Sequence, residues 1–328
     1  MRYFLLHVHG DLNGEDMVGP IIRTEALTRD FKSTRAVDSL SIEVPRGIVF
    51  GFLGPNGSGK TTTIRMLLGL LEPTSGKAVV LGFDTIQGPN DIRSRCGALL
   101  EHPGLYERLS AEDNLQLYAR IWGMRVSERG ARIREVLESF GLWDRRKDAA
   151  GTFSHGMKKK LAVARAMLHR PALLFLDEPT AGMDAVAAAG LRDDLAGIVR
   201  REGMTVFLTT HNLPEAEKIC SRVAVIRDGR LLAEGPTNEL RSRKEQNRVE
   251  IKGSGFSDGL LEKLRTDPQV RSAAAANGTL VLDLHDSSRI APLVRRLVEA
   301  GVELEEVRKG NASLEDAFLS LVEDDRSA

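Results

Sequence analysis

The spacing of apolar residues along the chain switches repeatedly between the two-residue period of strands and the longer period of helices. Strand-like apolar runs cover residues 21–27, 36–44 and 48–53. A helix-like run over 62–70 follows the third of them, and a further strand is predicted near 78–81. Such an alternation of strands and helices predicts a parallel α/β core.

The chain between about residues 100 and 165 is predicted to form a helical lobe inserted into this core. Ser110, followed by Glu112 and Asp113, resembles a capping box that opens a helix. A second helix is predicted over 129–140, where apolar residues recur on one face. Strands and helices alternate again after the lobe.

A smaller domain is predicted at the C-terminal end of the chain. The alternation of the core ends near residue 240, and the charged, apolar-poor segment 241–248 is predicted to be a linker. Asn277-Gly278 is the strongest short signal for a hairpin. The elements after the linker are predicted as strands over 249–252, 270–275, 279–284 and 302–307, helices over 258–265 and 288–300, and a last helix from Ser313. Their β-α-β-β-α-β order indicates a ferredoxin-like α+β domain.

The predicted organisation is a poorly structured leader over 1–18, a large α/β domain over 19–240 and an accessory domain over 241–328. Met17 is an alternative start to Met1, because the strand pattern begins just after it.

The segment that joins the strand over 48–53 to the helix over 62–70 fits G-x-x-x-x-G-K-[ST], the pattern of phosphate-binding loops. Glycines let backbone N–H groups curl around phosphate oxygens, and the positive end of the following helix faces the same anions. Lys60 is expected to reach the β- and γ-phosphates of a nucleotide, and the Thr61 hydroxyl to hold Mg²⁺. The residues predicted to bind the nucleotide here are Gly54, Pro55, Asn56, Gly57, Ser58, Gly59, Lys60, Thr61 and Thr62.

The charge balance excludes several classes of partner. The 328 residues include 46 basic and 46 acidic ones, so no net field attracts nucleic acid or anionic lipid. No apolar run approaches the ~18 residues that span a bilayer, and the first residues are too polar for a signal peptide. Cys96 and Cys220 have neither a pairing pattern nor metal-ligand spacing, which suits a reducing cytoplasm. We expect no nucleic-acid partner and no direct membrane insertion.

A second motif specifies the chemistry of the phosphate loop. Residues 172–176 read as a buried strand that ends in Asp177 and Glu178. In enzymes with a phosphate-binding loop, an Asp at such a strand end holds Mg²⁺, and an adjacent Glu is well placed to deprotonate the attacking water. We therefore predict that Asp177 is a metal ligand and that Glu178 is the general base that acts on the attacking water.

Taken together, the motifs from about residue 21 to residue 240 resemble those of the ATP-binding-cassette (ABC) ATPases. The resemblance implies that Phe31 stacks on adenine. Residues 153–157 are similar to the family signature Leu-Ser-Gly-Gly-Gln, in which Ser154 and Gly156 are retained. In the family this segment contacts the γ-phosphate held by a second cassette. The resemblance therefore implies a head-to-tail dimer, most simply a homodimer, with two composite sites.

Further family positions can be assigned from the same resemblance. Residues 181–184 are similar to the loop through which two cassettes sense each other, and His211, after the apolar strand 206–210, matches the histidine that senses the γ-phosphate and helps to hold Glu178. Glu101 stands where the family usually has a Gln that reaches Mg²⁺, so the resemblance implies a metal contact there. A slipped alignment that places His102 at this position is the alternative. Lys158, Lys159 and Lys160 are predicted to form a solvated helix face.

The resemblance implies the ATP-hydrolysing subunit of a bacterial-type exporter, cytoplasmic and peripheral on the inner face of the membrane beneath a separate permease. A Glu at the position of Glu101, and a C-terminal segment over 304–318 similar to that of daunorubicin-resistance cassettes, favour a drug, antibiotic or peptide as the substrate. The alternatives are a regulatory clamp that binds ATP without hydrolysis, and a soluble cassette ATPase with a role outside transport.

Overall fold

We describe a computed structural model of the chain that covers residues 19–245, 248–285, 290–309, 313–316 and 318. The predicted leader over 1–18 and most of the predicted last helix lie outside these described residues. Contacts between residues separate the chain into two compact units. The first unit consists of two segments, the chain up to His211 and Ala224–Leu231. The second unit consists of Asn212–Val223 and the chain from Leu232.

An antiparallel sheet forms one part of the first unit, and it was not predicted as a separate layer. Its strand order is β2-β1-β5-β6, with β3 also paired to β1. The predicted strand over 36–44 is two strands, because the backbone N–H of Ile42 donates to Thr24 Oγ1 instead of continuing the ladder. The strands are β1 (Ile22–Phe31), β2 (Thr34–Leu40), β3 (Glu43–Val44), β5 (Ser75–Val80) and β6 (Phe83–Asp84).

The second sheet is the predicted α/β core. Its order is β11-β10-β4-β9-β8-β7, and the β4–β9, β9–β8 and β8–β7 pairs are parallel. Phe50 stacks on Phe207 with ring centroids 5.5 Å apart in its fully buried interior. The strands are β4 (Val49–Leu53), β7 (Cys96–Leu99), β8 (Leu173–Asp177), β9 (Thr205–Thr210), β10 (Arg222–Arg227) and β11 (Arg230–Pro236). The first unit also contains helices α1 (Lys60–Leu67), α2 (Pro89–Arg95) and α6 (Ala185–Glu202).

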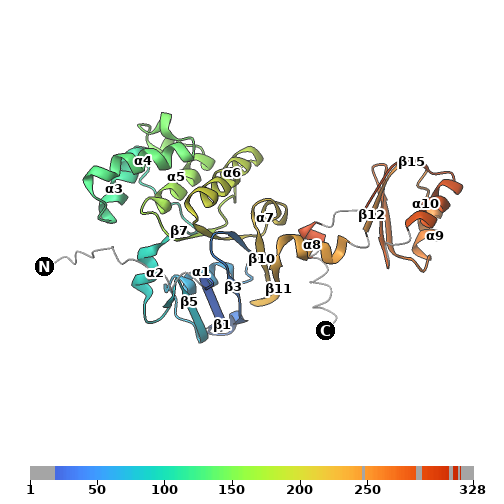
Figure 1. Ribbon diagram of the computed structural model, residues 1–328, viewed down its shortest axis with the longest axis horizontal. Helices are drawn as coiled ribbons and strands as arrows, with labels where there is room; N and C mark the ends of the chain where they lie inside the picture. The colour runs from blue at the N-terminus through green and yellow to red at the C-terminus, as the bar shows by residue number, and fades with distance from the viewer. Residues whose placement is uncertain (1–18, 246–247, 286–289, 310–312, 317, 319–328) are drawn as a thin grey trace. The chain divides into compact units, whose positions relative to one another are not determined.

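The predicted helical lobe is present, and its helices gather at the end of the first unit opposite β1 and β5 (Figure 1). Ser110 caps the first helix by accepting a hydrogen bond from the backbone N–H of Asp113, as the capping box predicted. Arg132 is buried inside the lobe, where its guanidinium donates to the carbonyls of Met167 and Leu168. The elements of the lobe are α3 (Ala111–Ile121), α4 (Val126–Ser139), α5 (His155–Met167) and the 3₁₀ turns η2 (Trp143–Arg145) and η3 (Ala150–Thr152).

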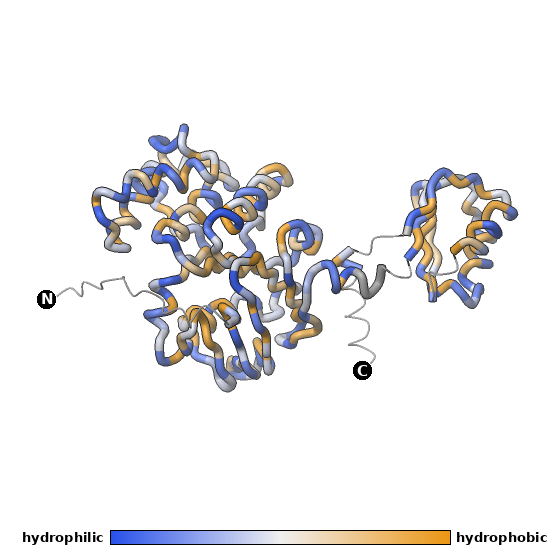
Figure 2. The backbone as a smooth tube through the Cα atoms, in the orientation of Figure 1, coloured by the Kyte–Doolittle hydropathy of each residue, from blue (hydrophilic) through white to orange (hydrophobic). Residues whose placement is uncertain are grey.

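The second unit contains the predicted β-α-β-β-α-β order. Its four strands form an antiparallel sheet of order β13-β14-β12-β15, and hydrophobic residues recur along its strands and helices (Figure 2). Asn277 and Gly278 both have positive φ angles, 50° and 74°, as the predicted hairpin turn requires. These elements are β12 (Arg248–Ser254), α9 (Asp258–Arg265), β13 (Val270–Ala276), β14 (Thr279–Leu284), α10 (Ile290–Glu299) and β15 (Glu303–Lys309).

The segment before β12 differs from the prediction. Residues 241–245, predicted to be a linker, complete helix α8 (Thr237–Glu245). Leu, Arg, Lys and Glu are good helix formers, so a charged and apolar-poor run of them need not be a linker. The same unit contains α7 (Leu213–Ile219), which is capped by the side chain of Asn212.

Candidate functional site

The predicted phosphate loop joins β4 to α1 in a conformation that only glycine tolerates at several positions. Gly57 and Gly59 have φ angles of 82° and 101°, and Gly59 is the N-cap of α1. A Cβ atom on Gly59 would lie 2.3 Å from the carbonyl oxygen of Ala36, and one on Gly54 would lie 2.4 Å from that of Ile226. Neighbouring backbone therefore packs tightly against the loop at Gly54 and Gly59, and neither position has room for a side chain.

Lys60 is the first residue of α1, and its ammonium group lies inside this loop. Its Nζ donates to the carbonyl oxygens of Gly54 at 2.7 Å and Pro55 at 3.0 Å. The same Nζ forms an ion pair with Glu178 Oε1 at 3.2 Å. The structure thus brings together two residues that the sequence separates by more than one hundred positions.

Asp177 lies at the end of β8, where two hydroxyl groups donate to its carboxylate. Thr61 Oγ1 donates to Oδ2 and Thr209 Oγ1 donates to Oδ1, both at 2.6 Å. Asp177 is 6% exposed, so both hydrogen bonds are shielded from water. The predicted pair of Mg²⁺ ligands, Thr61 and Asp177, is therefore assembled at one point.

Glu178 follows β8 with a φ angle of 49°, a left-handed conformation that is strained for this residue type. Its backbone N–H donates to Thr209 Oγ1 at 3.0 Å and contacts the carbonyl oxygen of the same residue at 3.2 Å. Its Oε2 lies 3.0 Å from His211 Nδ1. Strain at a residue held by this many contacts is typical of functional positions, and the carboxylate is fixed between Lys60 and His211.

These residues fit a nucleoside triphosphate and its metal ion. Ser58 Oγ is buried and has no hydrogen-bond partner within the described part of the chain, so it offers an unused donor inside the loop. Thr61 and Asp177 offer the hydroxyl and carboxylate oxygens that Mg²⁺ prefers. When bound, Mg²⁺ supplies positive charge that neutralises phosphate oxygens.

The signature residues lie at the start of α5, where their contacts are with another predicted loop. Ser154 caps α5 by accepting a hydrogen bond from the backbone N–H of Met157. His155 Nε2 lies 3.3 Å from the carbonyl oxygen of Ala181. A Cβ atom on Gly156 would meet the side chains of Ala187 and Met183 at 3.0 and 3.4 Å. His155 and Gly156 therefore pack against residues 181–187, while Ser154 is exposed at the start of the helix. A contact of Ser154 or Gly156 with a nucleotide stays a prediction.

Phe31 and Glu101 are both exposed. Phe31 ends β1 with 42% of its surface accessible, as a stacking platform requires. Glu101 lies beyond the end of β7, and its carboxylate forms a 3.9 Å ion pair with Arg65 of α1. The predicted metal contact of Glu101 remains a prediction, since the partner that the structure gives it is a cation.

The predicted solvated lysine face of α5 is wrong. Lys159 is 7% exposed, and burial lowers its pKa, although the charges of Asp177 and Glu178 act in the opposite direction. The amino groups of Lys158 and Lys160 form ion pairs of 2.7 Å with Glu107 and Asp194. These lysines face neighbouring elements of the fold because α5 is covered on several sides.

The sequence did not indicate Thr209, which connects the two acidic residues. Its side chain donates to Asp177 and accepts from the backbone of Glu178. The available signal was a hydroxyl residue two positions before His211, in a strand that also contains Thr205 and Thr210. That signal becomes specific only when β9 is known to pair with β8, with Thr209 beside Asp177.

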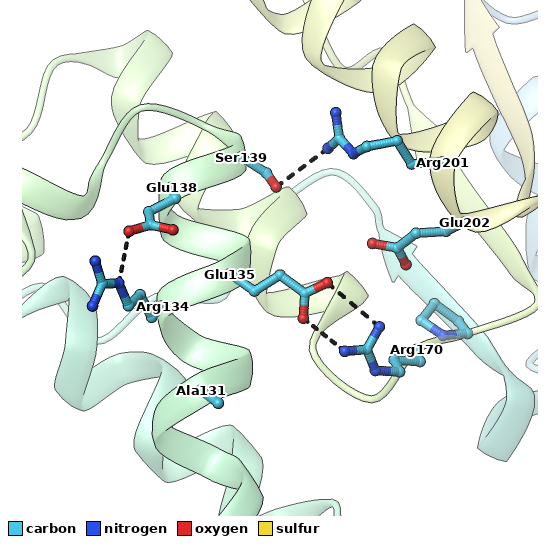
Figure 3. Close-up of a pocket in the computed structure, with 9 residues that line it drawn as sticks. Ala131, Arg134, Glu135, Glu138, Ser139, Arg170, Arg201 and Glu202 are labelled. Carbon is cyan, nitrogen blue, oxygen red and sulfur yellow. Dashed lines mark hydrogen bonds and ion pairs between the residues drawn. The ribbon is translucent and has the colours of Figure 1, made fainter.

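A separate hollow of about 870 Å³ lies between α4, the segment before β8 and the end of α6 (Figure 3). Its charged groups are largely paired with each other: Arg170 with Glu135 at 2.6 Å, and Arg134 with Glu138 at 2.7 Å. Arg201 from α6 reaches Ser139 of α4 (Figure 3). None of the predicted site residues lines this hollow, so the catalytic assignment does not involve it.

Comparisons with known proteins agree with this site. The family model described as ABC transporter matches residues 37–181. The bacitracin transport ATP-binding protein BcrA of Bacillus licheniformis is 36% identical over 92% of this chain and 97% of its own length. The daunorubicin/doxorubicin resistance ATP-binding protein DrrA of Streptomyces peucetius is 36% identical over 93% of this chain and 94% of its own. A solved ATP-binding subunit of an ABC transporter matches with a TM-score of 0.61 and 30% identity, over 68% of this chain and 92% of that one. The chain belongs to the ATP-binding, ATP-hydrolysing subunits of ABC transporters.

Proposed function

We propose that this chain powers a separate membrane permease that exports a drug, an antibiotic or a peptide. The observation that carries the proposal is the assembly of Lys60, Asp177, Glu178 and His211 next to the ends of the parallel strands β4, β8 and β9. The matched relatives are named for bacitracin transport and daunorubicin resistance, which supports the substrate class.

Each of these residues has a proposed role in hydrolysis. Lys60 and the loop 54–62 hold the phosphates, and Thr61 with Asp177 holds Mg²⁺. Glu178 takes the proton of the attacking water, while His211 keeps the carboxylate in place through its 3.0 Å contact with Oε2. A bound triphosphate offers Lys60 a more highly charged partner than Glu178, so the base becomes available as the phosphates bind.

The second cassette is proposed to be another copy of this chain. His155 and Gly156 pack against residues 181–187, so the two segments lie next to each other, as expected if both face a partner cassette. In such a dimer the backbone N–H groups at the start of α5 meet the γ-phosphate held by the other copy.

The proposed permease contact is an apolar surface near Glu101. A hollow of about 220 Å³ lies there, and its lining includes Leu68, Leu70, Leu100, Trp122 and His169. Leu70 is 54% exposed, so the hollow continues into an open apolar surface that suits an amphipathic helix of a membrane protein. No helix in the described residues is long and apolar enough to cross a bilayer. Because the proposed partner is a membrane permease, the proposed location is peripheral, on the cytoplasmic face of the membrane.

The enzymatic part of the proposal is tested by Glu178→Gln. General-base catalysis contributes about 100-fold or more, so the ATP turnover number should fall at least that far. ATP affinity should stay within about threefold, because the amide keeps the size of the side chain. Glu138→Gln, which changes an exposed carboxylate on α4, serves as the matched control and should keep full activity. Near-normal turnover in Glu178→Gln would remove the assigned base.

The transport part is tested with the same variant. Tagged Glu178→Gln protein, purified with ATP from detergent-solubilised membranes of its host, should retain a protein with several membrane spans that mass spectrometry identifies. Recovery from the soluble fraction alone, or with ribosomal or DNA-repair factors, would contradict the exporter proposal and leave the ATPase assignment intact.

A further inference from the structure

The aromatic side chain at the end of β1 is in contact with a cation. The guanidinium carbon of Arg29 lies over the ring of Phe31, 4.7 Å from the ring centroid. This distance is within the range of a cation–π interaction. Since Phe31 is 42% exposed, the guanidinium covers one face of the ring while part of the ring remains accessible.

The same guanidinium is tied to the chain that leaves the phosphate-loop helix. Arg29 Nη1 donates to the carbonyl oxygen of Glu72 at 2.7 Å. Glu72 lies five positions beyond the last residue of α1, in the connection to β5. A single side chain therefore contacts both the predicted base platform and the segment that follows the phosphate loop and α1.

Adjacent contacts make this end of β1 a fixed attachment. The backbone N–H of Asp30 donates to Thr74 Oγ1 at 2.9 Å, and that of Thr74 donates to the carbonyl oxygen of Thr28 at 2.8 Å. Arg29 Nε is buried and has no hydrogen-bond partner among the described residues. The contacts that set the position of the guanidinium are thus the Phe31 ring and the carbonyl oxygen of Glu72, while its Nε–H group makes no hydrogen bond in the described part of the chain.

We propose that Arg29 is a positioning residue for the base of the bound nucleotide. It occupies one face of the Phe31 ring and holds that ring at a fixed distance from the phosphate loop, so that the opposite face receives the adenine. The inference rests on the proposed function, in which Phe31 is the base platform. Its consequence is that Arg29 contributes to the binding of the base and not to the binding of the phosphates.

The test compares two ligands that differ in the base. A non-hydrolysable ATP analogue and inorganic tripolyphosphate are titrated calorimetrically into the full-length protein. In Arg29→Met, which keeps a long apolar side chain but removes the cation, the Kd of the analogue should rise about fivefold, the size of one cation–π contact. The Kd of tripolyphosphate should stay within about twofold. Arg29→Lys should recover part of the loss because it restores a cation.

Two further variants separate the possible outcomes. Arg35→Met removes an exposed arginine of β2 that pairs with Asp30 and Asp38, and it should change neither Kd. Phe31→Ala should raise the Kd of the analogue at least as much as Arg29→Met does. If Phe31→Ala has no effect, the base platform is misassigned and the inference fails with it.

The inference alone fails under three results. In the first, binding of the analogue is weaker in Phe31→Ala but not in Arg29→Met. In the second, Arg29→Met binds both ligands more weakly, and to the same extent. In the third, Arg29→Met binds the analogue more tightly. The second result would mean that Arg29 only supports the fold. The third would mean that the guanidinium covers the face that the base needs.

Discussion

At the scale of single residues, the hydroxyl of Thr209 connects Asp177, the proposed metal ligand, with Glu178, the proposed general base. It donates to Asp177 Oδ1 and accepts from the backbone N–H of Glu178, which has a strained positive φ angle. Thr209 is fully buried, so water cannot replace either hydrogen bond. Thr209 therefore helps to position both acidic residues, although it contacts neither the phosphates nor the water in the proposed reaction.

Thr209→Val should lower the ATP turnover number by about tenfold, because a lost hydrogen bond of this kind is worth on the order of 1 to 2 kcal/mol. Steady-state hydrolysis measures the turnover number, and calorimetry measures the affinity for ATP. The affinity should change less than the turnover number. Thr205→Val removes a buried hydroxyl from the same strand, one that accepts from the backbone N–H of Gly47. This control should lose stability but keep its turnover number. Equal turnover in both variants would show that Thr209 acts only through the fold.

The residues that carry motifs were predictable from the sequence, and those that support them were not. Lys60, Glu178 and His211 were identified from motifs, and the structure brings them together because each lies at the end of a strand or the start of a helix. Thr209 and Arg29 act through partners on other elements, and a single sequence does not give the register of those elements. Lys159 was misassigned for the same reason, since the elements that cover α5 are remote in the sequence.

At the scale of elements, the end of α5 is joined to the end of α3 by two stacked rings. The rings of Trp122 and His169 lie 3.7 Å apart and nearly parallel. His169 Nε2 donates to the carbonyl oxygen of Cys96, and its Nδ1 is buried without a hydrogen-bond partner in the described residues. Burial lowers the pKa of His169 from 6.5 to about 4, and the nearby charge of Arg132 adds to the effect. The folded protein therefore holds this imidazole neutral.

This shifted pKa gives the free energy of unfolding a pH dependence. Between pH 6.5 and about 4 the unfolded chain binds a proton at His169 that the folded chain does not, so stability falls as the pH is lowered through this range. The full loss is on the order of 3 kcal/mol, and it is absent above pH 6.5. Urea unfolding at several pH values should show a shallower fall for His169→Phe, which keeps a ring beside Trp122. Both proteins have the same carboxyl groups, so the contributions of these groups cancel when the two unfolding free energies are subtracted. Parallel curves for the two proteins would contradict the shift.

Element types were predicted better than element boundaries and layers. The capping box at Ser110 and the Asn277-Gly278 turn are local signals, and both were confirmed. The charged segment 241–245 is helical because helix propensity does not require an apolar face. The antiparallel sheet of β1, β2, β3, β5 and β6 could not be recognised as a separate layer, because strand pairing depends on contacts between distant segments.

At the scale of the whole molecule, the division into an ABC cassette and a C-terminal accessory domain remains our proposal. The contacts place the boundary within the chain differently, since α7 and the residues from Leu232 belong to the second unit. The strand order of that unit agrees with the predicted β-α-β-β-α-β arrangement. The motif residues of the proposed chemistry all belong to the first unit.

The proposed homodimer makes a prediction at the same scale. The Glu178→Gln variant retains ATP, so it should sediment as a dimer with ATP and as a monomer without it. Adding Ser154→Asp should abolish the dimer, because a carboxylate at the start of α5 repels the γ-phosphate held by the second copy. Aspartate is also a good N-cap, so α5 keeps its cap and the fold should be unaffected.

The matched control is Ser127→Asp, the same change at an exposed residue in the first turn of α4. It should leave the ATP-dependent dimer intact. In the Ser154→Asp variant, ATP affinity of the monomer should be retained, because the phosphate loop of each copy is unchanged. A dimer that persists with Ser154→Asp would place the signature segment outside the composite site. If the Glu178→Gln variant without Ser154→Asp stays monomeric with ATP, the result would instead indicate that this cassette pairs with a different chain.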